Sequence, residues 1–113
     1  MHNQIHPVPP GLADHLVRNE ITEIIHPYLR YIEGWQLRMS YLRAQLATHP
    51  AGSDEHDLAE KRLLELLDEV DASRQYLVVE TNRLPPDDRV DTTLDEIDGF
   101  LIAVRAAIGT QGA

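Results

Sequence analysis

Apolar residues recur in three stretches of this chain at alternating spacings of four and three residues. Such spacings keep side chains on one side of an α-helix, so each stretch predicts a helix with a face that must be buried. The first stripe is Tyr28, Ile32, Trp35, Met39, Leu42 and Leu46. The second is Ala59, Leu63, Leu66, Val70, Ser73 and Leu77, with Ser73 as its only weak step. The third is Val90, Leu94, Ile97, Leu101, Val104 and Ile108.

Segments rich in proline and glycine separate these stripes. Residues 49–53 predict a turn, and Ser53 or Asp54 can cap the helix that follows. Long helices joined by short connections pack as antiparallel neighbours. The sequence therefore predicts an all-α fold, an antiparallel three- to four-helix bundle built on a long helical hairpin of 27–48 against 54–83.

The last helix has two candidate starts. Thr93 and Glu96 have the spacing of a capping box, whereas Asp87 and Asp88 fit a start one to two turns earlier. Gly109 is expected to end this helix, because glycine is the usual residue after a helix C-terminus.

Pro27 decides how the first helix is divided. Proline lacks an N–H group and its ring collides with the carbonyl four residues earlier, so we expect a short helix over 11–26 and a second helix that starts at Pro27. The apolar stripe through Ile21 and Ile25 continues in phase into Tyr28, however. A single kinked helix therefore fits the pattern nearly as well.

A chain of 113 residues fits a single domain. Residues 11–109 are predicted to form it, between an extended proline-rich arm at 1–10 and a flexible tail at 110–113. Long helices with single apolar stripes often bury them by dimerising, so we expect a homodimer.

Apolar residues beside the main stripes, together with the stripe residues that they flank, predict a surface for a second subunit or a partner. The helix over 54–83 is apolar nearly all round near its C-terminal end, and the first stripe has aromatic neighbours. Coverage of this region by the first helix is the alternative. The expected contact residues are Tyr76, Leu77, Val78, Val79, Tyr31 and Trp35.

The formal net charge of −9 is unevenly distributed. Residues 54–98 hold fifteen acidic against five basic side chains, whereas residues 1–50 hold four of each. An acidic surface repels phosphate backbones and anionic membranes, so we expect neither nucleic acid nor a membrane as a partner. A protein partner with a basic surface, facing Glu65, Asp68 and Glu69, is expected instead if the acidic surface binds anything. Solubility alone is the commoner explanation for such an excess of acidic side chains.

Cysteine is absent, which excludes disulfides, thiolate metal sites and cysteine nucleophiles. No apolar run approaches the roughly 18 residues of a membrane span. The first residues lack the basic and apolar regions of a secretion signal. We therefore expect a cytoplasmic protein.

A histidine motif lies near the start of the predicted first helix. His15 is followed by Arg18 and Asn19, and apolar residues come six and nine positions after it, at Ile21 and Ile24. This spacing resembles that around the phosphoaccepting histidine of sensor-kinase dimerisation hairpins. The resemblance implies phosphotransfer through His15, with Arg18 and Asn19 beside it.

Other histidines lie near acidic residues. Glu23 and His26 have the Glu-x-x-His spacing that places two metal ligands on one helical face. His49 and His56 flank the predicted turn and, with a nearby acid, form an alternative ligand set for a divalent ion. The acids in question are Asp54 and Glu55. Solvated side chains near helix ends are the commoner explanation for such groups, so no cofactor is expected.

The chain shows no phosphate-binding loop, nucleophile elbow or Ser–His–Asp arrangement. We therefore expect a small acidic protein–protein interaction or regulatory module without catalytic activity. Phosphotransfer, a metal-binding bundle and a DNA-mimic inhibitor are the alternatives.

Overall fold

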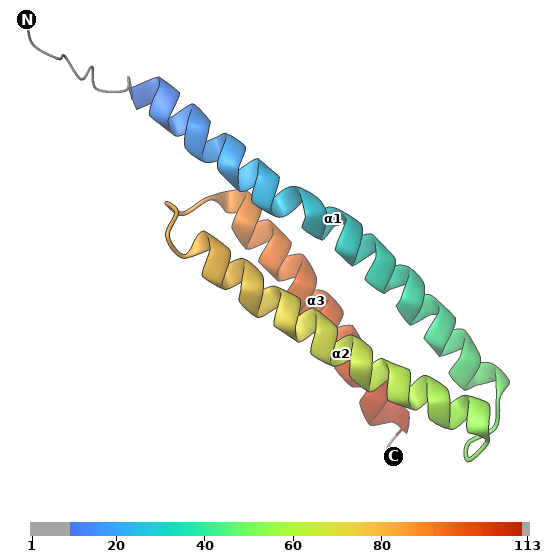
Figure 1. Cartoon of the computed structure of the whole chain (residues 1–113). Helices are drawn as coiled ribbons and strands as arrows, with labels where there is room; N and C mark the ends of the chain where they lie inside the picture. Colours follow the sequence, from blue (N-terminus) through green and yellow to red (C-terminus); the bar gives the residue numbers. More distant parts are fainter. Residues whose placement is uncertain (1–9, 112–113) are drawn as a thin grey trace, which may run out of the picture.

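The computed structural model describes residues 10–111, which form three α-helices that all contact one another, with each helix antiparallel to the next along the chain (Figure 1). α1 spans Pro10–Thr48, α2 spans Asp54–Thr81 and α3 spans Asp88–Gln111. Residues 10–111 contain no strand, so the predicted all-α bundle is confirmed, with three helices. None of the three helices combines the length and the apolarity needed to cross a membrane.

The predicted ends of the domain need correction. Pro10 already belongs to α1, and the rest of the predicted arm lies outside the described residues. α3 continues past Gly109 through Thr110 and Gln111, which were expected in the tail. A glycine therefore does not end α3 at this position.

The predicted break at Pro27 is wrong, since α1 runs through the proline as one helix, as the alternative had it. A proline inside a helix costs about 3 kcal/mol. Burying one large apolar side chain contributes about 1.5–3 kcal/mol. Ile21 and Ile25 before the proline are buried, as are Tyr28 and Ile32 after it. Together these four side chains outweigh the local cost of the proline.

The core forms where one side of α2 packs between α1 and α3. Leu63, Leu66, Val70 and Leu77 of α2 have no exposed surface. They join most of the predicted stripes of α1 and α3 in one cluster. A smaller cluster of Ile21, Ile25 and Val90 lies toward the turn between α2 and α3. All three predicted stripes thus face the interior.

The turn between α1 and α2 contains the glycine and the helix cap that the sequence predicts. Gly52 has a φ of 88°, a conformation that side chains rarely adopt. Ser53 is extended and caps α2, since its side chain accepts a hydrogen bond from the backbone N–H of His56 at 3.2 Å.

The start of α3 is held by Asp87 and Arg89, so the earlier of the two predicted starts is confirmed. The carboxylate of Asp87 accepts hydrogen bonds from the backbone N–H of Arg89 at 2.8 Å and from its guanidinium at 3.1 Å. The guanidinium also reaches α1, where it donates to Thr22 Oγ1 at 2.7 Å and to the Arg18 carbonyl at 3.2 Å. The hydrogen bonds from Arg89 lower the pKa of Asp87 below its ordinary value. Thr93, the other candidate cap, is buried within the helix.

Replacing Leu63 by alanine should cost about 2–5 kcal/mol in the free energy of unfolding, because the side chain is fully buried and leaves a cavity. Leu64→Ala is the matched control, since Leu64 is 51% exposed and its loss should stay within about 0.5 kcal/mol. Urea denaturation of both variants measures the difference. Equal losses would contradict the assignment of the buried face of α2.

Asp87→Ala should cost about 1 kcal/mol at neutral pH, because α3 loses its cap. The folded pKa of Asp87 is lowered, so its stabilising contribution is complete above the unfolded value of about 3.9. It is lost as the pH falls through the lower folded value. The stability difference between wild type and Asp87→Ala should therefore shrink below about pH 4.

Thermal unfolding over a pH series measures this narrowing. Asp88→Ala removes a negative charge from the same end of α3 without removing the cap, and is the matched control. A difference that stays constant with pH would contradict the role assigned to the ionised Asp87.

Candidate functional site

An open groove of about 690 Å³ lies between α1 and α2. Three tyrosines and three glutamates supply most of the polar groups that line it. They are Tyr28, Tyr31, Tyr76, Glu20, Glu23 and Glu80. We refer to it as the acidic groove.

Small side chains explain why the helices leave space here. Ala72 and Ser73 line the α2 side of the groove, and Pro27 lines the α1 side. Ser73 is the weak step in the α2 stripe, and its hydroxyl donates to the Glu69 carbonyl of its own helix at 2.9 Å. A leucine at this step would fill part of the space, so the groove follows from the one gap in the apolar pattern.

The tyrosines offer one buried hydroxyl and two exposed rings. Tyr28 is 4% exposed, and its hydroxyl donates to Glu80 Oε1 at 3.4 Å. Burial and the adjacent carboxylate raise the pKa of Tyr28, so the phenol stays protonated. Tyr31 and Tyr76 are more than half exposed, so a ligand can reach both rings, and Tyr31 also packs against the rings of Tyr28 and Trp35.

The glutamates give the groove its negative charge. Glu20 pairs with Arg83 at 2.5 Å, and Glu80 accepts from Tyr28. The side chain of Glu23 has neither a hydrogen bond nor an ion pair among the described residues. Its backbone carbonyl also receives no N–H from Pro27, because proline has none to donate. The groove therefore presents hydrogen-bond acceptors to a ligand that binds in it.

The predicted acidic surface is only partly available to a partner. Glu65 and Asp68 are exposed on α2. Glu69 accepts hydrogen bonds from Trp35 Nε1 at 2.8 Å and from the Arg38 guanidinium at 2.6 Å. Its carboxylate thus joins α2 to α1, and neutralising it would disturb the helix pair.

The predicted contact residues divide into two groups. Tyr31 and Tyr76 line the acidic groove, and Val78 and Val79 are exposed on α2. Two others belong to the core and are not available at the surface, because both continue the apolar stripes. These residues are Trp35, at 4% exposure, and Leu77, at 0%.

His15 lies on the exposed N-terminal part of α1, away from the acidic groove. Asn19 Nδ2 is 3.4 Å from His15 Nε2, one helical turn away. Arg18 is exposed, and its backbone carbonyl accepts from Arg89 of α3. His15, Arg18 and Asn19 thus lie on one helix, as the phosphotransfer expectation requires, and phosphotransfer through His15 stays a prediction.

The predicted metal ligands do not come together as expected. Glu23 and His26 are exposed on α1, and His49 Nε2 contacts Gln45 Oε1 at 3.1 Å. His56 is buried and lies beside Glu60. Within residues 10–111, the only group of three potential ligands combines His56 with Asp57 and Glu60.

Sequence reasoning missed Glu20, Tyr28 and Glu80 as groove residues. Tyr28 and Glu80 are 52 positions apart, so no local pattern joins them. The interrupted stripe at Ala72 and Ser73 is the one signal that could have indicated a gap between the helices.

Comparisons with protein-family models, with curated proteins and with solved structures find no significant match to this chain.

Proposed function

We propose that this protein is a non-catalytic interaction module that binds a lysine- or arginine-rich segment of a partner protein in the acidic groove. One observation carries the proposal. Three glutamates and two exposed tyrosine rings meet in a single groove, and within residues 10–111 only one of these glutamates, Glu20, is paired with a basic residue. Carboxylates attract ammonium and guanidinium groups, and tyrosine faces bind them through cation–π contacts.

The charge of the whole chain supports a basic partner over a second copy. The net charge of −9 repels another molecule of the same protein and attracts a cationic one. Val78 and Val79 lie exposed on α2, the same helix that supplies Tyr76, and extend the surface that such a partner would cover. A homodimer is therefore an alternative outcome of the test.

The groove favours binding over catalysis because of the residue types it contains. The polar groups of its lining are carboxylates, phenols and the aliphatic hydroxyl of Ser73. The lining includes no histidine, lysine or arginine. The Ser73 hydroxyl donates to the Glu69 backbone carbonyl and, within residues 10–111, forms no hydrogen bond with a histidine or a carboxylate that could activate it.

A fluorescein-labelled arginine-rich dodecapeptide tests the proposal by fluorescence anisotropy. Glu23→Gln and Tyr76→Ser should each weaken binding about two- to fivefold, since each removes one exposed contact to the cation. The affinity should also fall when the ionic strength is raised from about 0.01 M to about 0.15 M, because salt screens the carboxylates.

Matched controls separate a specific groove from general acidity. Glu33→Gln makes the same charge change on α1 outside the groove, and Tyr41→Ser removes an exposed tyrosine outside it. Both should bind the peptide as the wild type does. Equal losses in all four variants, or no binding of the peptide by the wild type, would overturn the proposal. If the wild type has twice the monomer mass in solution and Tyr76→Ser lowers this mass, the result would favour a second copy of the chain as the partner instead.

A further inference from the structure

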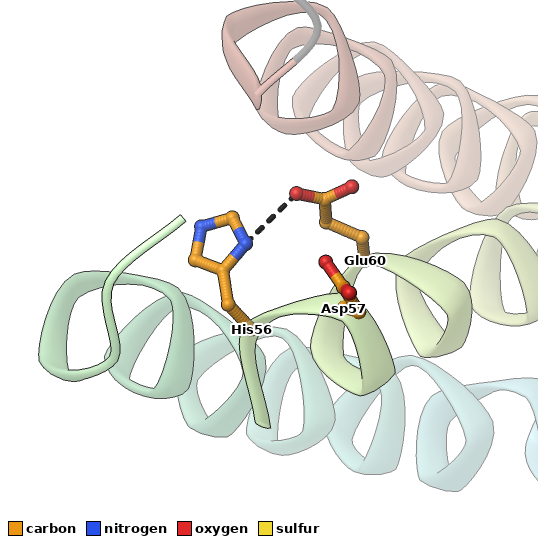
Figure 2. A group of neighbouring side chains, drawn as sticks. All are labelled: His56, Asp57 and Glu60. Atoms are coloured by element: carbon orange, nitrogen blue, oxygen red, sulfur yellow. Dashed lines mark ion pairs between the residues drawn. The ribbon is translucent and has the colours of Figure 1, made fainter. Parts of the chain in front are cut away.

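A second group of polar side chains lies at the start of α2, separate from the acidic groove. His56, Asp57 and Glu60 come from the first two turns of the helix, and their potential ligand atoms all lie within 4.8 Å of one another. Figure 2 shows the His56 ring and the Glu60 carboxylate facing each other, with the Asp57 carboxylate beside them. The Ser53 cap fixes this turn through the backbone N–H of His56.

His56 is an unusual residue for a core position. It is only 4% exposed, and its Nδ1 atom is buried without a hydrogen-bond partner. Nδ1 lies 2.8 Å from Glu60 Oε1, which is close enough for an ion pair with a protonated ring. The two atoms nevertheless form no hydrogen bond, so Nδ1 keeps the ion-pair contact alone. A buried polar atom without a partner is rare in folded proteins and calls for an explanation, such as a bound ion.

The spacing of the three groups suits a metal ion. Two ligands that each lie about 2.1 Å from one ion are about 3.0–3.4 Å apart in octahedral or tetrahedral geometry. The observed 2.8 Å between Nδ1 and Oε1 approaches this range, so the Glu60 side chain would need only a small shift to share an ion with His56. The Asp57 carboxylate lies within 4.8 Å of the other two groups and would turn toward them to complete the site. Glu60 is 42% exposed at its side chain and Asp57 is exposed, so an ion can enter from solvent.

Local charge also favours a cation. The N-terminus of a helix carries partial positive charge, which opposes cation binding. The first turn of α2 counters it with Asp54, Glu55 and Asp57, and Glu60 follows one turn later. These acids make the surroundings of His56 net negative.

We propose that His56, Asp57 and Glu60 bind one divalent transition-metal ion. One imidazole nitrogen with two carboxylate oxygens suits a borderline ion such as Zn²⁺, with water completing the coordination. Mg²⁺ and Ca²⁺ prefer sites made only of oxygen ligands. This site is independent of the acidic groove, and its failure would leave the proposed function untouched.

Isothermal titration of the full chain with ZnCl₂ tests the site. The chain is first freed of metal, and His2 and His6 are replaced by glutamine so that they do not contribute. We expect one Zn²⁺ per chain. Glu60→Gln and Asp57→Asn should each weaken binding at least tenfold, and MgCl₂ should not compete. Both substitutions are at accessible carboxylates, so the fold should survive them, unlike a substitution of the buried His56.

His26→Gln is the matched control, because His26 is an exposed histidine with an acid three positions before it. It should bind Zn²⁺ as the parent does. The melting temperature gives an independent readout, since an ion that binds the folded state raises it. Zn²⁺ should raise it in the parent and in His26→Gln, but not in Glu60→Gln. Absence of binding in the parent, or equal affinity in Glu60→Gln, would overturn the proposal.

Discussion

The burial of one side of α2 against both other helices is the contact on which the remaining structure depends. Four α2 side chains have no exposed surface, and burial of each contributes about 1.5–3 kcal/mol. Because α2 contacts both α1 and α3, it sets the distance and direction of each. Where its stripe is interrupted at Ser73, the contact with α1 loosens and the acidic groove opens. The candidate site is thus a local exception in the packing that holds the helices together.

Polar contacts between the helices lie around this core and fix their alignment. Glu69 joins α2 to Trp35 and Arg38 of α1, and Arg74 pairs with Asp98 of α3. Exposed ion pairs contribute at most about 1 kcal/mol each, so their main effect is to select one register over its neighbours. The chain has 19 acidic and only 10 basic residues. Pairing therefore leaves an acidic excess at the surface, which is the basis of the proposed partner chemistry.

The sequence predicted the helices well because the apolar period is a local property. All three stripes face the core, and Ser53 caps α2 as its residue type suggested. Pro27 was misjudged because its local penalty is visible in the sequence, whereas the burial that offsets it depends on contacts with distant helices.

Sites made by residues far apart in the chain were harder to predict. Tyr28 meets Glu80 across two helices, and nothing in either local sequence indicates the other. His56 was predicted to pair with His49, because the two residues flank the same turn. The helix instead places Glu60, four residues on, beside the ring.

α1 is longer than the helices it packs against, and its beginning projects past the turn between α2 and α3 (Figure 1). Leu16 is 54% exposed, whereas Ile21 just beyond is buried. Amide protons around His15 and Leu16 should therefore exchange with solvent through local fraying, while those after Ile21 should wait for the whole bundle to open. One continuous helix would then contain two regions that differ in protection, with the boundary between Leu16 and Ile21.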